Sequence, residues 1–514
     1  MTIKNTCLPF ALGMSALLIA APALAAEDEV KMSPEASVTK HRRSAFSADP
    51  FYDNRVYDYD AQLQIYGGKS PVDTPRPLLE LGKRIYDKGT FPEESYIFGE
   101  LNPVSQQFVV YGDWRTAAVY NDLSQTTRDR ATVATKLTLE LDYKITATER
   151  LHVGITPLDR DGNITRYEFG GGLKSDDETV LDFRADSAFF EGDLGAIVSG
   201  FTGSYTSWDM PFAVGLMPLQ FQNGIWVDDA FTGFALSVVS KHSKALNISN
   251  YDVTFFAGFD KVDSPIDADL LTAGVQTSQR RSNVFGLATF FDANQGYWEL
   301  DYGFTQGQDD LDDQSYHNVA AGFTRRYGGW LSNSVRVITN FGQDRDDLPV
   351  GSRTTADGTL YLLENSLITS RPSTLVPYFN LFAGVGRPQA LARAAAAGGV
   401  LKNVGITFES DNMTGYPTLD ATAFNTVGGA LGIQYLFGLD RQIVFEVAGV
   451  DLRDDDKTAT NGRAAIADRQ SAVGIRYQQN LSKAWLFRMD ANYSNNKIEA
   501  TDFWGARIEL RRKF

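Results

Sequence analysis

The chain has 514 residues, and its 48 Lys and Arg against 64 Asp and Glu give a formal net charge of −16. This acidity argues against a nucleic-acid partner, because phosphate binding requires clustered Lys and Arg in excess. A hydrophobic content of 43% excludes a disordered chain. The single cysteine, Cys7, excludes intrachain disulfides and thiolate metal sites.

The N-terminus has the features of a secretion signal. Lys4 is the only charge in the first 26 residues, and an apolar run over residues 11–21 follows it. The segment Ala23-Leu24-Ala25 then provides the small-x-small site that signal peptidase reads. Because the run is shorter than the roughly 20 residues of a membrane anchor, we predict removal of residues 1–25 and export by the general secretory route.

Residues 26–105 are predicted to be an N-terminal extension. Residues 26–48 are charged and poor in aromatics, which is typical of a tail. Residues 49–105 contain a candidate strand at 61–68 and a segment at 78–86 that reads as a strand or a short helix. Whether this part is a periplasmic extension, a plug or an additional hairpin stays open.

The rest of the chain alternates between apolar and polar residues. From Leu137 to Ile145 and from Trp485 to Tyr493, every second residue is apolar and those between are mostly polar. Side chains on a strand alternate sides, so each segment is predicted to be a strand with one apolar face. A soluble sandwich and a membrane barrel both produce this pattern.

Three further features favour the membrane barrel. The strands are about ten residues long, the length that a tilted membrane strand needs. Short turns such as residues 146–150 and 438–442 alternate with long acidic connections such as 306–314, 343–358 and 451–469, as in barrels of the outer membrane. Aromatic residues end the apolar faces, as an interfacial girdle requires: Trp114, Tyr120, Trp298, Tyr327, Trp485, Tyr493 and Trp504.

The signal peptide, the alternating strands from Phe108 to Phe514 and the asymmetric connections together resemble a Gram-negative outer-membrane porin. Residues 215–224 are also similar to strand-turn segments of alginate-export-type barrels. The end of the chain departs from the usual porin terminus, because Arg512 stands where an apolar or aromatic residue is common. Arg512 is therefore expected to weaken recognition of this terminus by the machinery that inserts barrels into the outer membrane.

The predicted fold class is therefore all-β. Residues 106–514 are expected to form a transmembrane, antiparallel, up-and-down β-barrel of about 16–18 strands, with short periplasmic turns and long acidic extracellular loops. Such a barrel would lie in the outer membrane among phospholipid and lipopolysaccharide. Association with further copies of the chain is compatible with this fold and stays open.

Strand parity predicts which side chains face the lumen. The candidate pore-lining residues are Asp113, Arg115, Arg326, Arg336, Arg476, Arg488, Asp490, Arg507, Glu509 and Arg511. Five of these arginines fall on the first strand or the last three, which barrel closure would bring together on one wall. These arginines could form a positive field that favours anions. Alternatively, they could pair with carboxylates in the lumen, and the sequence leaves both interpretations open.

The sequence indicates no cofactor. It has no CxxCH motif for haem, and His41, His152, His242 and His317 are not at metal-ligand spacing. Solvated charge is the expected state of the acidic clusters in the loops. These clusters could nevertheless bind hard cations such as Ca²⁺ or bridge lipopolysaccharide: Asp309, Asp310, Asp312, Asp313, Asp454, Asp455 and Asp456.

The leading functional hypothesis is a passive channel for small hydrophilic solutes, with anions as one option. One alternative is a docking barrel around a periplasmic partner such as a multihaem cytochrome, and another is a polysaccharide-export barrel. A lipid-modifying enzyme is not expected, because parity places no histidine on a lipid-facing position.

Overall fold

The computed structural model describes thirteen stretches of the chain. These are residues 75–82, 95–122, 130–160, 162–170, 178–266, 282–343, 355–394, 397–409, 413, 418–438, 440–453, 469–496 and 501–514. The predicted signal peptide, the candidate strand at 61–68 and the cluster Asp454–Asp456 lie outside these residues.

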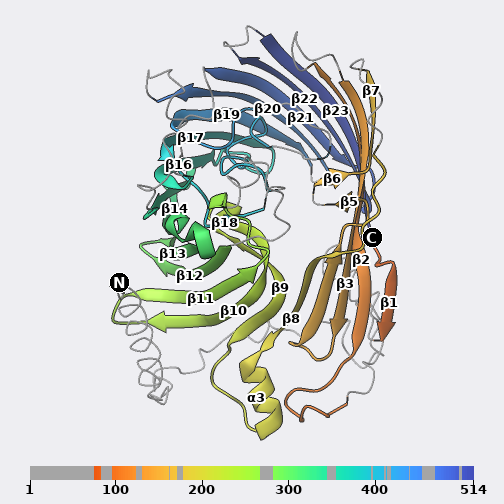
Figure 1. The fold of residues 1–514 in the computed structure, drawn as a ribbon, viewed down its shortest axis with the longest axis vertical. Coiled ribbons are helices and arrows are strands. Elements are labelled where there is room, and N and C mark those ends of the chain that lie inside the picture. The colour runs from red at the N-terminus through yellow and green to blue at the C-terminus, as the bar shows by residue number, and fades with distance from the viewer. Residues whose placement is uncertain are drawn as a thin grey trace, which may run out of the picture. The chain divides into compact units, whose positions relative to one another are not determined.

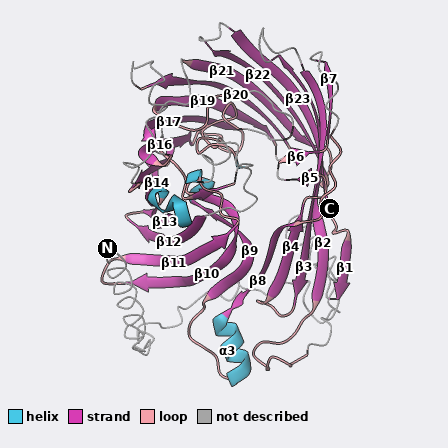
Figure 2. Cartoon of the chain, in the orientation of Figure 1, coloured by secondary structure: helices cyan, strands magenta, loops and turns pink. Residues whose placement is uncertain are grey.

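The described residues are mainly β-strands (Figures 1 and 2). The first strands of the large sheet are β1 (Leu79–Gly82), β2 (Gln107–Asp122), β3 (Arg130–Lys144), β4 (Arg150–Ile155), β7 (Arg166–Gly170), β8 (Ala185–Asp193), β9 (Pro211–Phe221), β10 (Val227–Ser243), β11 (Ile248–Asp260), β12 (Ser282–Ala293) and β13 (Gly296–Gly307). They are followed by β14 (Tyr316–Tyr327), β15 (Leu331–Phe341), β16 (Asp357–Leu367), β17 (Leu375–Arg387), β18 (Ala392–Arg393), β19 (Thr426–Phe437), β20 (Arg441–Leu452), β21 (Gln470–Asn480), β22 (Trp485–Asn496) and β23 (Thr501–Lys513). Outside this sheet lie β5 (Asp159–Arg160), β6 (Asn163–Ile164), the α-helix α3 (Leu194–Thr202) and the 3₁₀ turns η3 (Gln222–Gly224) and η4 (Asp309–Gln314).

The large sheet closes on itself. Consecutive wall strands pair antiparallel from β2 round to β23, and β23 then pairs with β2, with Arg115 opposite Arg511. The strands β4 and β7 share one place beside β3, because β4 pairs with its C-terminal part and β7 with its N-terminal part. The closed barrel has 18 strands, so the predicted all-β antiparallel barrel is confirmed.

The two faces of the wall differ as the alternation predicts. On β19 the outward side chains of Leu431, Ile433 and Tyr435 are exposed at the outer surface, and Leu431 is 62% exposed. On the inward face, Glu446 and Asp490 are buried. An apolar outside and a polar inside are the pattern of a barrel that meets lipid on its outer surface.

One residue departs from the predicted parity. His317 lies on the outward face of β14, because its neighbour Asn318 points inward and is buried. Its ring packs against Phe304 and Phe341, and its Nδ1 lies 2.9 Å from the Tyr302 hydroxyl. The expectation that no histidine faces outward was therefore wrong. A lipid-modifying enzyme of this kind would pair the histidine with a nucleophilic serine. The hydrogen-bond partner of His317 is instead the hydroxyl of Tyr302.

Connections at the two ends of the barrel differ in length. Residues 294–295 and 328–330 are tight turns at one end, called here the short-turn end. At the same end α3 joins β8 to β9, and its N-cap Asp193 accepts a hydrogen bond from the Ala196 amide. In the described part of the chain, no helix is both long enough and apolar enough to span a membrane.

Part of the predicted N-terminal extension adds to the wall. The strand β1 pairs with β2 through Leu79 opposite Val110, next to the point where Gly112 bonds to the C-terminal residue Phe514. The segment at 78–86 is thus a strand where it is described. Residues 95–104 fold against the turn between β3 and β4, where the Asn102 amide donates to Glu149 over 2.9 Å.

The longest connection within the described wall folds into the barrel. It joins β17 to β19 and spans residues 388–425, called here the infolded segment; 388–394, 397–409, 413 and 418–425 are described. Figure 1 shows the coloured loops of its described residues and β18 within the ring of strands. The tip of the β9–β10 hairpin lies beside it, because β10 pairs in parallel with β18. Two separate connections therefore narrow the lumen.

The outward face can be tested on one strand. Leu431→Arg should cost about 2–4 kcal/mol of folding free energy, because the cation would face hydrocarbon. Gln434→Arg on the same strand should cost little folding free energy, because Gln434 faces the lumen. Urea-dependent refolding into phospholipid vesicles measures both. Equal destabilisation of the two variants would contradict the assignment of faces.

Candidate functional site

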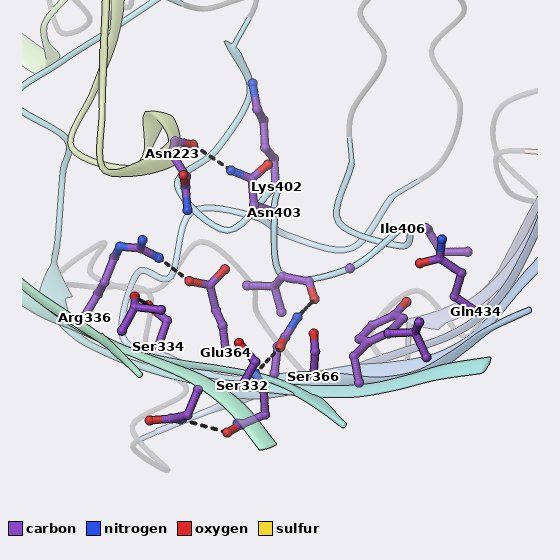
Figure 3. A pocket seen from close by; sticks show the side chains of 18 of the residues that line it. Asn223, Ser332, Ser334, Arg336, Glu364, Ser366, Lys402, Asn403, Ile406 and Gln434 are labelled. Carbon is purple, nitrogen blue, oxygen red and sulfur yellow. Dashed lines mark hydrogen bonds and ion pairs between the residues drawn. The ribbon is translucent and has the colours of Figure 1, made fainter. Parts of the chain in front are cut away.

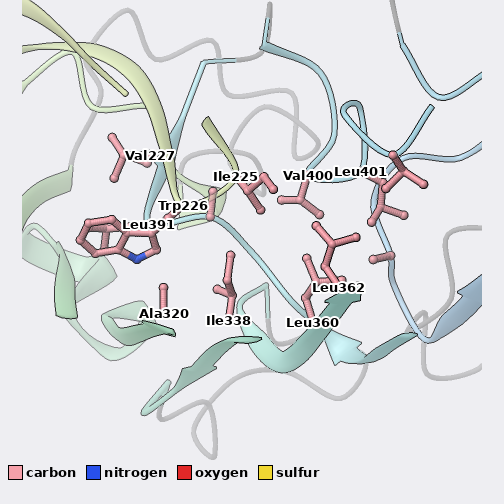
Figure 4. Packing of buried hydrophobic residues seen from close by; sticks show 14 of the residues in the cluster. Ile225, Trp226, Val227, Ala320, Ile338, Leu360, Leu362, Leu391, Val400 and Leu401 are labelled. Carbon is pink, nitrogen blue, oxygen red and sulfur yellow. The ribbon is translucent and has the colours of Figure 1, made fainter. Parts of the chain in front are cut away.

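An apolar cluster joins the infolded segment to the wall. Trp226 at the hairpin tip and Leu391 and Leu401 of the infolded segment are fully buried. They pack against inward wall residues such as Ile338 and Leu360 (Figure 4). Burying a side chain of this size stabilises the packed state by about 1.5–3 kcal/mol. Since a water-filled lumen would be lined by polar groups, apolar inward positions mark where the infolded segment is docked.

Small residues make room for this docking. Ala430, Ala448 and Ala472 face one another across β19, β20 and β21 and are all buried in the same cluster. Their inward side chains are short, so the infolded segment can approach the wall closely. This row of alanines gives the docking surface its shape.

Wall side chains also bind the backbone of the infolded segment. Asn340 holds Gln389 from both sides, because its amide nitrogen donates to the Gln389 carbonyl (3.1 Å) and its oxygen accepts from the Gln389 amide (2.7 Å). Asn318 donates to the same carbonyl (3.0 Å) and accepts from the Trp226 indole (2.9 Å). The Tyr316 hydroxyl donates to the Leu391 carbonyl over 2.9 Å. Backbone groups that leave water need such partners.

The carboxylate of Glu446 is a second anchor. Glu446 is fully buried on β20 and accepts from the amides of Ile406 and Thr407, both at 2.9 Å. It also accepts from the Thr407 hydroxyl (2.6 Å) and from the Tyr378 hydroxyl. Four donors thus converge on one carboxylate. Such charge-assisted hydrogen bonds are stronger than neutral ones.

Two glycines leave space around Glu446. Gly432 and Gly474 lie directly opposite Glu446 on the neighbouring strands. A Cβ at Gly432 would overlap the Tyr378 hydroxyl, and one at Gly474 would lie 2.9 Å from the Thr407 Cγ2. The glycines therefore permit the contacts of Tyr378 and Thr407 with the carboxylate.

A guanidinium fixes the hairpin tip to the infolded segment. Arg393 donates to the carbonyls of Gly398, Ala397 and Gly399 within its own segment and to the carbonyl of Gly224 in η3. Asp228 accepts from the Ala394 amide through its backbone carbonyl (2.9 Å) and lies 3.2 Å from the Lys402 ammonium. The two infolded connections therefore form one unit.

The first wall strand, β2, and the last three, β21 to β23, are called here the seam. The five predicted arginines on these strands lie together, and each pairs with a carboxylate. Arg115 pairs with Glu509 (2.7 Å), and Arg511 with Asp113. Asp490 pairs with three arginines: Arg476 (2.6 Å), Arg488 (2.8 Å) and Arg507 (2.7 Å).

Glu409 brings a further carboxylate to this wall from the infolded segment. It lies 2.6 Å from Arg476 and 3.2 Å from Arg488. Burial opposes its ionisation, but the two guanidinium groups outweigh this and hold the pKa of Glu409 below its usual range. The five arginines thus have four carboxylate partners, which are Asp113, Glu409, Asp490 and Glu509. The network carries little net charge.

The remaining predicted site residues lie apart from the seam. Arg336 is buried on β15 between Glu299 (3.3 Å) and Glu364. Arg326 is exposed near the short turn between β14 and β15. Asp309, Asp310, Asp312 and Asp313 belong to the turn η4. Within the described residues, no group of three or more His, Cys, Asp or Glu is placed to hold a metal ion.

The sequence patterns did not single out the docking residues of the infolded segment, which are Asn318, Asn340 and Glu446. Two signals point to them: the connection 388–425 is far longer than typical connections, and β16 carries apolar residues at the adjacent positions 360–363. An apolar inward face on a predicted lumen strand indicates that something covers it.

A cavity lies on the short-turn side of the infolded segment (Figure 3). It has a volume of about 640 Å³ and is bounded by β13 to β19 and by residues 402–409. Most of its lining side chains are hydroxyls and amides, among them Ser332, Ser366, Asn380 and Gln434. We call it the short-turn cavity.

Comparison with known proteins finds no matching family model and no matching curated protein. Among solved structures, the chain is similar to OccK5 (OpdH) of Pseudomonas aeruginosa, with 12% identity, a TM-score of 0.46 and coverage of 79% of this chain and 98% of the other. It is also similar to the outer membrane protein OprD of the same organism, with 10% identity, a TM-score of 0.46 and coverage of 79% and 93%. The carbohydrate-binding barrel Wzi of Escherichia coli has 12% identity, a TM-score of 0.42 and coverage of 78% and 85%. These likenesses concern the fold alone.

The role of Glu446 can be tested against a matched carboxylate. Glu446→Ala should weaken docking of the infolded segment by on the order of 3 kcal/mol, because buried donors lose their acceptor. Trypsin should then cleave at Lys402 about a hundredfold faster, since cleavage follows the population of the open form.

Glu364→Ala is the control, because Glu364 pairs with Arg336 of the wall and not with the infolded segment. Limited proteolysis of the detergent-solubilised proteins gives both rates. If Glu446→Ala resists trypsin as the wild type does, Glu446 is not an anchor.

Proposed function

We propose that the protein is a passive channel of the Gram-negative outer membrane for small hydrophilic solutes. The observation that carries this proposal is the closed wall, which exposes apolar side chains outward and holds charged and amide side chains inward. A barrel of 18 strands is wide enough for an aqueous path. The proposed role of the wall is to form a pore, and no bond chemistry is assigned to it.

The infolded segment sets the width of this path. Its apolar cluster and its backbone hydrogen bonds hold it against β14 to β21, so that solutes pass beside it. A sheath around a periplasmic protein needs an empty lumen for its partner, and an exporter of polysaccharide needs a wide one. The docked segment therefore favours a channel for small solutes over both alternatives.

The charges inside the wall do not require the solute to be an anion. An anion preference would need positive groups without partners, whereas Arg115, Arg476, Arg488, Arg507 and Arg511 all have carboxylates within ion-pair distance. We therefore propose that the predicted pore-lining residues mainly support the wall and keep it hydrated. Passage then depends more on size and polarity than on charge.

Conductance in planar lipid bilayers tests this function. The full-length protein should form channels, and replacing residues 390–422 with a short glycine-rich turn should raise the single-channel conductance severalfold, because the obstruction is removed. Leu431→Ala, which changes only the outward wall, should leave the conductance unchanged. If neither the wild type nor the shortened protein conducts, the channel function is wrong.

A further inference from the structure

The short-turn cavity has the size of a small-molecule site. Its volume of about 640 Å³ falls within the ~300–1,000 Å³ of typical ligand pockets. Its wall is formed by strands on one side and by the docked residues 402–409 on the other. A solute in this cavity would therefore contact both the wall and the infolded segment.

The charged groups of this cavity are already compensated. Arg336 pairs with Glu299 and Glu364 of the wall. Lys402 lies 3.2 Å from Asp228, and Glu409 pairs with two arginines of the seam. A charged solute would have to compete with these pairs for a counter-ion, and the pairs of the buried Arg336 are costly to break.

The hydroxyl and amide side chains of the cavity are better placed than its paired charged groups to bind a solute. Ser332 and Ser366 lie directly opposite each other on β15 and β16, and both line the cavity (Figure 3). Within the described residues, neither hydroxyl makes a side-chain hydrogen bond. The Gln434 amide nitrogen donates to Gln442, which leaves its oxygen as an acceptor for a solute. Hydroxyls and amides both donate and accept, so they match other hydroxyls.

The cavity also has an aromatic and apolar surface. Tyr297 lines the cavity, is 39% exposed and leans against Phe290 with ring centroids 5.4 Å apart. Val376 and Ile406 add apolar surface. The C–H faces of a sugar ring pack well on such a surface, while its hydroxyls need partners at the rim.

From this arrangement we propose that the short-turn cavity binds an uncharged sugar of one or two rings, as a station on the path through the barrel. The Ser332 and Ser366 hydroxyls and the Gln434 amide hydrogen-bond the sugar hydroxyls, and Tyr297 packs on the ring. The proposal rests on the channel function, which would bring such solutes to the cavity. Binding of the sugar to the cavity can nevertheless be measured whether or not the protein conducts.

Calorimetric titration of the detergent-solubilised full-length protein with maltose tests the cavity directly, with succinate as the charged comparison. Maltose should bind and succinate should not. The double variant Ser332→Ala/Ser366→Ala should bind maltose roughly tenfold more weakly, because two hydrogen bonds are lost. Thr138→Val, which removes one hydroxyl from the inward face of β3 outside the cavity, should bind as the wild type does.

The outcomes separate the two proposals. Maltose binding that the serine variant weakens supports the sugar site, and brief interruptions of the channel current by maltose would place this site on the conducting path. Binding of succinate but not maltose overturns the inference, as does maltose binding that the serine variant leaves unchanged. An absence of conductance overturns only the channel function, since the titration does not depend on it.

Discussion

The hydrogen bonds between β2 and β23 close the sheet, and the rest of the structure follows from this closure. A closed wall leaves neither β2 nor β23 as a free edge, so neighbouring wall strands satisfy each other's backbone groups. The outer surface can then be apolar, as Leu431 and its neighbours are, and polar side chains are left with the interior. Closure also brings the first and last wall strands together, which is why Arg115 meets Glu509.

The interior is occupied by the chain itself. The infolded segment leaves water when it docks, so its amides and carbonyls must find new partners. Asn318, Asn340 and Glu446 provide them, while the alanine row of β19 to β21 provides contact surface. The wall therefore both faces outward with apolar side chains and binds the segment that narrows the lumen.

Much of this architecture could be predicted from the sequence because strand alternation has only two faces. The outward direction of Leu431, the inward direction of Asp490 and the meeting of Arg115 with the last strand all follow from parity and closure. The pairing of Arg476 with Glu409 could not be predicted, because Glu409 belongs to a connection whose path depends on tertiary packing. Parity also failed locally at His317, where an aromatic setting on the outer wall accommodates the ring.

Two features of the sequence did carry information about the docked segment. The adjacent apolar residues Leu360, Tyr361 and Leu362 violate the alternation, and the structure shows that Tyr361 faces outward while Leu360 and Leu362 pack beneath the infolded segment. The connection 388–425 is long, which is typical of functional loops. A break in alternation opposite a long connection thus indicates a lumen that is partly filled.

The central claim is that the described residues of the infolded segment are docked inside the barrel. Thr407 and Gly474 permit a direct measurement, because a Cβ at Gly474 would lie 2.9 Å from the Thr407 Cγ2, and Cys7 is the only cysteine of the sequence. The double substitution Thr407→Cys/Gly474→Cys should form a disulfide on mild oxidation, and the oxidised protein should keep the conductance of its reduced form because the segment is already in place. Failure to form the disulfide in the folded protein, or a conductance that changes when it forms, would contradict the account.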